Sequence, residues 1–255
     1  MIINDVGTHD KANNLQKTLL LTGATSGIGE ALCEQYLTLG WKIIACGRNQ
    51  EKLAILENKE NISTLRLDLN DTKQVLNVFA PLPALDLVIL NAGNCEYIDD
   101  AKQFDGKLFE RVINTNLISI GYCLEALLPK IKMGGQLALV GSSASFLPFS
   151  RAQAYGASKA GIAYLASSLA IDLKQSDIDV SLIRPGFVKT PLTDKNNFNM
   201  PMRISSDEAA TFIIQGLHKR QFDIHFPKKF TLILKAIAFL PESLWRSFCA
   251  RTLQK

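Results

Sequence analysis

The stretch Thr18-Leu-Leu-Leu-Thr22-Gly23-Ala-Thr-Ser-Gly27-Ile-Gly29 decides the fold of this 255-residue chain. Its first five residues predict a short buried strand, and the residues after Gly29 follow a helical pattern that ends near Gly40. Glycines between a strand and a helix let backbone N–H groups approach a phosphate, and the helix N-terminus adds a favourable dipole. We therefore expect a phosphate-binding loop here, although a glycine motif alone is weak because glycines also mark ordinary turns.

Strands and helices alternate along the rest of the chain. We expect strands at 41–46, 62–67, 85–90, 136–140 and 178–183, and helices at 49–56, 71–79, 104–132 and 153–174, with Asn114-Thr115-Asn116 interrupting the third helix. This alternation predicts an α/β fold: a Rossmann-type, doubly wound parallel sheet with helices on both faces. We expect one dinucleotide-binding and catalytic domain at 17–227, preceded by a flexible lead-in at 1–16 and followed by a basic, apolar helical segment at 228–255.

Polar or glycine-containing turns follow the predicted strands. In open α/β sheets, ligands bind at the carboxyl ends of the strands, near the point where the strand order reverses. These turns therefore predict one crevice, lined by the glycine loop, Arg48, Asp68, Asn91-Ala92-Gly93, Ser142 and Pro185-Gly186.

Tyr155-Gly-Ala-Ser-Lys159, near the start of a long predicted helix, indicates proton-transfer chemistry. Residues four apart share a helix face, so the ammonium group of Lys159 can approach the phenol of Tyr155. A nearby cation favours the phenolate, and we expect it to lower the tyrosine pKa from about 10 towards neutrality. On its own this spacing is more often an ordinary half-exposed helix face, so the chemistry depends on the other motifs.

Those motifs together resemble the classical short-chain dehydrogenase/reductase family from about Thr18 to Phe226. The family pattern Thr-Gly-x-x-x-Gly-x-Gly falls on Thr22 to Gly29, and its Tyr-x-x-x-Lys falls on Tyr155 and Lys159. Asn-Ala-Gly is at 91–93, Pro-Gly with a following threonine is at 185–190, and a serine stands thirteen residues before the tyrosine, at Ser142.

The resemblance implies an oxidoreductase with four catalytic residues. Tyr155 would donate a proton to a carbonyl oxygen or, in the reverse direction, take one from an alcohol. Lys159 would tune Tyr155 and hold the nicotinamide ribose, and Ser142 would hydrogen-bond the substrate oxygen. Asn116 would hold a water linked to Lys159, although a mid-helix asparagine can also be a simple kink or a surface residue.

The resemblance also implies a nicotinamide cofactor, whose type is decided after the second strand. An acidic residue there favours NAD, whereas Arg48 can pair with the extra phosphate of NADP, so we expect NADP(H). Some NADP-binding members carry a basic residue where this chain has Ser26. The implied cofactor contacts are Gly23, Ser26, Gly27, Ile28, Gly29, Arg48, Asp68, Leu69, Asn91, Ala92, Gly93, Tyr155, Lys159, Pro185, Gly186, Val188 and Thr190.

Apolar residues surround the predicted catalytic end. The stretch 191–205 contains Leu192, Phe198, Met200 and Met202, and we expect it to form a mobile lid with an apolar lining. Phe146, Leu147 and Phe149 either face the same pocket or belong to the core. We expect an apolar carbonyl or alcohol as the substrate. An NADP-sensing regulatory protein and an epimerase or dehydratase are the alternatives.

Charge and cysteine usage exclude other classes. The net charge is +4, but residues 228–255 alone hold six basic residues and one acidic residue, so the body has no basic excess and we expect no nucleic-acid partner. The five cysteines have no metal or redox spacing, so we expect no metal site, reduced thiols and a cytoplasmic protein. Family members are commonly homodimers or homotetramers, which we expect here. Segment 228–255 either meets a membrane surface, covers the cleft or contacts a partner subunit.

Overall fold

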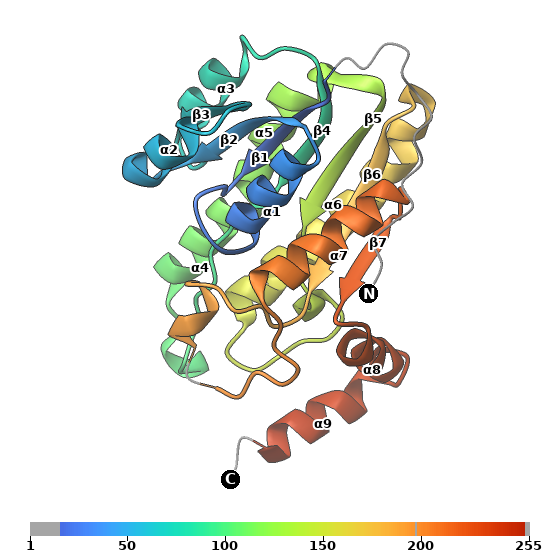
Figure 1. Ribbon diagram of the computed structural model, residues 1–255. Coiled ribbons are helices and arrows are strands. Elements are labelled where there is room, and N and C mark those ends of the chain that lie inside the picture. Colours follow the sequence, from blue (N-terminus) through green and yellow to red (C-terminus); the bar gives the residue numbers. More distant parts are fainter. Residues whose placement is uncertain (1–15, 197, 253–255) are drawn as a thin grey trace.

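The computed structural model describes residues 16–196 and 198–252, and Figure 1 shows a sheet with helices layered against it. The lead-in predicted at 1–16 lies outside the described residues except for Gln16, whose amide donates to the Gly40 carbonyl. Seven parallel strands form the sheet in the order β3-β2-β1-β4-β5-β6-β7. The strands are β1 (Thr18–Thr22), β2 (Lys42–Gly47), β3 (Ile62–Arg66), β4 (Leu85–Leu90), β5 (Ile131–Val140), β6 (Asp179–Pro185) and β7 (Asp223–Phe226).

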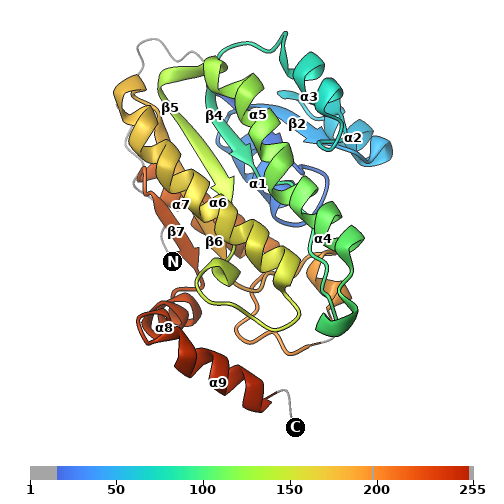
Figure 2. The ribbon, with the colours of Figure 1, turned by 180° about the vertical axis from the view of Figure 1, so that it is seen from behind.

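Helices cover both faces of this sheet. Figure 1 shows α1 (Gly27–Thr38) and α7 (Ser206–His218) on one face, and Figure 2 shows α3 (Thr72–Phe79), α5 (Ser119–Leu127) and α6 (Gln153–Asp172) on the other. In the buried strand β1, Leu19 and Leu21 pack in the core with α1 and α7, whereas Leu20 packs in the core with α3, α5 and α6. The predicted Rossmann-type fold is confirmed.

The order of strands reverses between β1 and β4. From β1 the chain winds outwards to β2 and β3, then returns to β4 beside β1 and continues to β7. At such a reversal the two neighbouring strand-to-helix connections leave on opposite faces of the sheet and open a crevice between them. The glycine loop after β1 and Asn91 after β4 stand at this point.

The helix predicted at 104–132 is interrupted in the structure. It consists of α4 (Gly106–Ile113), a π-helical turn at Asn114–Ile118 and α5, and it ends in a 3₁₀ turn at Leu128–Lys130. Pro129 lies in this last turn and has no backbone N–H to continue an α-helix, so β5 begins at Ile131, five residues earlier than predicted. By length and hydropathy the run Gly106–Lys130 is long enough to cross a membrane, but four of its apolar residues belong to the core: Ile120, Cys123, Leu124 and Leu127.

Two elements near the C-terminal end were not predicted. Helix α7 begins with a capping box in which Ser205 Oγ accepts from Glu208 N and a Glu208 carboxylate oxygen accepts from Ser205 N. Strand β7 has only four residues and pairs with β6 at the sheet edge. It leads into α8 (Lys228–Ala238) and α9 (Glu242–Thr252), and both views place these two helices at the end of the molecule where the strands have their carboxyl ends. The remaining helix, α2 (Gln50–Glu57), connects β2 and β3.

Candidate active site

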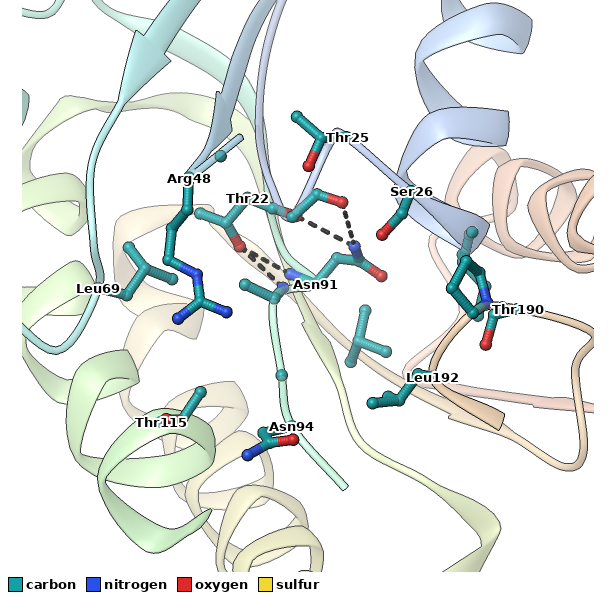
Figure 3. A pocket seen from close by; sticks show the side chains of 18 of the residues that line it. Thr22, Thr25, Ser26, Arg48, Leu69, Asn91, Asn94, Thr115, Thr190 and Leu192 are labelled. Atoms are coloured by element: carbon teal, nitrogen blue, oxygen red, sulfur yellow. Dashed lines mark hydrogen bonds between the residues drawn. The ribbon is translucent and has the colours of Figure 1, made fainter. Parts of the chain in front are cut away.

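A cleft of about 460 Å³ opens at the carboxyl ends of the strands. It is lined by residues that follow β1 to β6, together with side chains from α6 and Thr115 from the π-helical turn. Figure 3 shows Arg48, Leu69, Asn91, Thr190 and Leu192 around this space. The predicted crevice therefore exists, and most of the residues assigned to it by resemblance line it: Gly23, Ser26, Gly27, Ile28, Arg48, Asp68, Leu69, Asn91, Ala92, Gly93, Ser142, Tyr155, Lys159, Pro185, Gly186, Val188 and Thr190.

The glycine loop has no room for side chains. Gly23 and Gly27 have φ angles of +68° and +55°, and a Cβ on Gly27 would lie 2.8 Å from Thr190 Cγ2. Gly29 does not line the cleft but lies beneath the loop, where a Cβ would approach the Gly23 carbonyl oxygen to 2.1 Å. Within the described residues, the Ser26 side chain makes no capping bond to α1, so the first N–H groups of the helix face the cleft without a side-chain acceptor. This arrangement fits the diphosphate of a dinucleotide.

Hydrogen bonds connect the carboxyl ends of β1 and β4, where the strand order reverses. Thr22 Oγ1 accepts from the backbone N–H groups of Asn91 and Ala92 at 3.0 and 3.1 Å. In return, Asn91 Nδ2 donates to the carbonyl oxygens of Thr22 and Gly23 at 3.1 and 3.3 Å, and Figure 3 shows these bonds. The glycine loop and the turn after β4 are thus held together as one floor of the cleft.

Arg48 stands at the outer end of the cleft. Its guanidinium lies 3.9 Å from an Asp68 carboxylate oxygen, and its side chain is 72% exposed. An exposed ion pair at this distance contributes little to stability, so the guanidinium is available to another anion. Asn49, the next residue, accepts from Lys52 N and caps α2, which fixes the direction in which the chain leaves Arg48.

Tyr155 and Ser142 lie together at the inner end of the cleft. The Ser142 hydroxyl hydrogen-bonds the Tyr155 phenol, and Ser142 Oγ also accepts from Ala144 N at 3.1 Å. Burial raises the pKa of Tyr155, and the Ser142 hydrogen bond opposes that rise only in part. The pKa of Tyr155 therefore shifts in the direction opposite to the lowering expected from the sequence. Removing the phenolate from water costs more free energy than the interactions with its polar neighbours contribute. Tyr155 is therefore a neutral phenol at neutral pH and can act as a proton donor.

Lys159 lies one helical turn after Tyr155 and is only 5% exposed. Its Nζ donates to the Val140 carbonyl oxygen at 2.9 Å and lies 5.7 Å from the centre of the Tyr155 ring. Burial lowers the pKa of Lys159 to about 8, so the ammonium form still predominates at neutral pH. The two side chains therefore approach each other as predicted, but the ammonium group of Lys159 donates its hydrogen bond to the carbonyl at the end of β5.

Asn116 lies behind the cleft wall rather than in it. It is fully buried in the π-helical turn, where Oδ1 accepts from Asn94 N at 2.6 Å and Nδ2 donates to Asn94 O and Ser158 Oγ at 2.8 and 3.0 Å. A Cβ on Gly93 would lie 3.2 Å from Asn116 Oδ1 and 3.5 Å from Lys159 Nζ, so both side chains come close to the point where a side chain of residue 93 would begin. The π turn supplies the extra residue that turns this amide inwards, as such turns often do at functional sites.

The segment predicted as a lid has an ordered base. Thr193 Oγ1 donates to Val188 O at 2.6 Å, and Ile204 pairs with Val188 as an isolated bridge. Leu192 lines the cleft, whereas Phe198 packs edge-on against Tyr97 with ring centres 5.4 Å apart. Whether the segment moves stays a prediction.

Three aromatic or apolar residues considered for the pocket lie elsewhere. Phe146 packs beneath the Arg184 guanidinium at 4.8 Å, Phe149 contacts Trp245 of α9, and Leu147 is buried. None of them lines the described cleft. Conversely, several lining residues were not predicted: Thr22, Thr25, Cys46, Gly47, Asn49, Leu67, Asn70, Asn94, Thr115, Val140, Gly141, Pro191, Thr193 and Lys195. Most of these directly neighbour a predicted residue, which is the signal that identifies them.

Comparisons with known proteins agree with this site. The profile described as short chain dehydrogenase matches residues 17–200. An uncharacterized oxidoreductase of Myxococcus xanthus (strain DK1622) is 30% identical over 246 residues, which cover 92% of this chain and 97% of that protein. The NADP-dependent 3-hydroxy acid dehydrogenase YdfG of Salmonella typhi is 32% identical over 178 residues, covering 67% of this chain and 72% of that protein. The closed form of serine dehydrogenase complexed with NADP+ is a similar solved structure, with 25% identity, a TM-score of 0.73, and coverage of 82% of this chain and 94% of that chain. The chain therefore belongs to the short-chain dehydrogenase family of oxidoreductases, which use a nicotinamide dinucleotide.

Proposed function

We propose that this protein is an NADP(H)-dependent reductase that converts an apolar carbonyl compound to the alcohol, with Tyr155 as the proton donor. The observation that carries the proposal is a single cleft with a guanidinium, Arg48, at one end and a half-buried phenol, Tyr155, at the other. Between them lies the glycine loop that fits a diphosphate. When bound, the nicotinamide supplies the hydride for the carbonyl carbon.

The chain's own residues divide the remaining work. Ser142, already hydrogen-bonded to the phenol, orients the substrate oxygen towards Tyr155. Tyr155, kept neutral by burial, gives its proton to that oxygen as negative charge develops there. The charge of Lys159 then stabilises the phenolate that remains, and Asn116 holds the chain around Gly93 against Lys159.

An apolar substrate is supported by a row of aromatic rings next to the catalytic end. Phe187, directly after Gly186, has its ring centre 6.2 Å from that of Phe198 and 5.5 Å from that of Phe230. Phe198 in turn contacts Tyr97, whose phenol is close enough to Tyr155 for the two to interact electrostatically. Leu192 adds an aliphatic side chain to the cleft itself. Such a wall favours hydrocarbon over charged groups.

The use of NADPH rather than NADH is supported by Arg48, and the variant Arg48→Ala tests it. A guanidinium that pairs with a phosphate contributes about 1.5 to 3 kcal/mol. We therefore expect the variant to bind NADPH roughly ten- to a hundredfold more weakly and NADH almost unchanged, measured by titration of protein fluorescence with each cofactor. Arg66→Ala, which removes another arginine from the same side of the sheet but not from the cleft, is the matched control. Equal losses of affinity for NADPH and NADH would show that Arg48 supports the loop and does not bind the extra phosphate.

A homodimer or homotetramer is also part of this proposal. Between Gln153 and Asp172, Lys159 is the only charged residue of α6, and it is buried. The outer face of the helix presents Tyr164, 81% exposed, and Ile171, 75% exposed, beside small side chains. An uncharged helix face with large exposed apolar groups is typical of a surface that another subunit covers.

A further inference from the structure

Helix α8 is fixed to the body by one of its faces. Thr231 is fully buried, and Leu234 is 6% exposed. The Thr231 hydroxyl lies 2.7 Å from His225 Nδ1, and Lys235 Nζ lies 2.5 Å from an Asp223 carboxylate oxygen. These contacts to β7 set the orientation of the helix, so its opposite face is a defined part of the molecular surface.

That opposite face of α8 is apolar where a surface helix is normally polar. Leu232 and Ile233 are 54% and 52% exposed, and Phe239 and Leu240, at the end of the helix, are 91% and 53% exposed. Leu232 and Phe239 are seven residues apart, as are Ile233 and Leu240, and this two-turn spacing places them along one side. A helix that is buried on one side and apolar on the other needs a second apolar environment to cover it.

Helix α9 extends this surface. Trp245 Nε1 donates to the Pro148 carbonyl oxygen at 2.6 Å, and the Trp245 ring packs edge-on against Phe149. This anchor leaves Leu244 57% exposed on the same helix. Figures 1 and 2 show α8 and α9 together at one end of the molecule, below the strands. We call the exposed side chains of Leu232, Ile233, Phe239, Leu240 and Leu244, with the basic residues Lys228, Lys229, Arg246 and Arg251, the C-terminal surface.

The charge of the C-terminal surface is strongly biased. Helices α8 and α9 contain five basic residues and one acidic residue, Glu242, which pairs with Arg246. Lys228 and Lys229 are the first two residues of α8, and no acid stands in its first turn. A cation at a helix N-terminus opposes the helix dipole, so these lysines weaken α8 instead of supporting it. An external anion would offset that cost.

We propose that the C-terminal surface docks on an anionic lipid bilayer. Exposed apolar side chains enter the boundary between headgroups and acyl chains, and lysines and arginines beside them meet the anionic headgroups. The eleven residues of α8 are too short to span the bilayer, so the helix lies on it. A second copy of this chain is the less suitable occupant, because pairing two C-terminal surfaces would bring like charges together. This inference is independent of the proposed reaction.

Co-sedimentation with vesicles tests the proposal directly. We expect the full-length protein to bind vesicles of phosphatidylcholine mixed with phosphatidylglycerol at low salt, and not to bind vesicles of phosphatidylcholine alone. Binding should weaken steadily as salt rises from about 0.01 to 1 M, because the Debye length falls from about 30 to 3 Å over that range.

Two double variants separate the charged and apolar contributions. Lys228→Gln with Lys229→Gln should weaken binding to the mixed vesicles about thirtyfold, since each lysine near an anionic surface strengthens binding about fivefold. Leu232→Ser with Phe239→Ser should weaken it at least tenfold. Leu39→Ser with Ile55→Ser replaces two other exposed apolar side chains, 57% and 63% exposed, and should leave binding unchanged. Circular dichroism and thermal melting confirm that each variant is folded.

Two results would overturn the proposal. The first is a full-length protein that does not bind the mixed vesicles at low salt. The second is an apolar double variant that binds them like the wild type while its mass in analytical ultracentrifugation falls to that of a smaller oligomer. In that case the C-terminal surface is an interface between copies of this chain.

Discussion

Replacing Tyr155 by phenylalanine should lower kcat for carbonyl reduction by about 10²- to 10⁴-fold while NADPH binding stays within a few-fold of the wild type. The substitution removes one hydroxyl and keeps the ring, so packing in the cleft is preserved. Without that hydroxyl the developing charge on the substrate oxygen has no proton donor, and Ser142 loses its hydrogen-bond partner. Steady-state NADPH consumption gives kcat, and fluorescence titration gives the dissociation constant of NADPH.

The matched control is Tyr164→Phe, on the exposed face of the same helix. It should retain wild-type kcat, because Tyr164 is distant from the cleft lining. If Tyr155→Phe kept more than about a tenth of the wild-type kcat, the proton would have to come from another residue.

Replacing Lys159 by methionine should abolish turnover and, at the same time, make the protein more stable. Burial lowers the pKa of Lys159 from 10.5 to about 8, which means that keeping its charge in the fold costs about 3 kcal/mol. Methionine fills a similar volume without a charge, but it leaves the Val140 carbonyl without its donor, a loss of about 1 to 2 kcal/mol. We expect a net gain of about 1 to 2 kcal/mol in unfolding free energy at pH 7. The melting temperature should rise by roughly 2 to 8 °C.

The pH dependence of this gain has a definite sign. Below pH 8 the lysine is charged in both the folded and the unfolded protein, so the wild type carries the full cost of burying the charge. Between about pH 8 and 10.5 the unfolded chain binds more protons than the folded protein, so wild-type stability rises relative to the variant. Thermal melts at pH 7 and pH 10 should therefore show the gain shrinking. A gain in unfolding free energy that is constant with pH would show that the buried charge is not its cause. The control is Lys52→Met on the exposed side of α2, which should show no gain at either pH.

The general arrangement of the site residues could be predicted from the sequence alone. The site depends on three local features of the sequence: glycines that tolerate no Cβ, polar residues at strand ends, and the four-residue spacing of Tyr155 and Lys159. In a parallel sheet, each of these features has one physical interpretation. The position of Arg48 in the cleft follows for the same reason, because the carboxyl end of β2 lies beside that of β1.

Features that depend on tertiary packing could not be predicted from the sequence. The pKa of Tyr155 is set by how much water the completed cleft excludes, and that burial outweighs the hydrogen bond from Ser142. The inward turn of Asn116 depends on one extra residue in a π-helical turn, which has no composition signal of its own. Phe146 was placed among the pocket candidates because it is close in sequence to Ser142, but the Arg184 and Lys235 side chains hold it on the other side of the strand ends. Helix α7, by contrast, was predictable from Ser205 and Glu208.

The most direct test of the account is a product assay: NADPH oxidation followed over a panel of ketones, aldehydes and 3-oxo acids of increasing chain length, with the alcohol quantified by mass spectrometry. We expect that at least one apolar carbonyl compound is reduced with one alcohol formed per NADPH consumed, that the rate rises with apolar length, and that Tyr155→Phe eliminates the product. NADPH that binds tightly with no alcohol formed from any member of the panel would contradict it and would identify the protein as a cofactor-binding regulator.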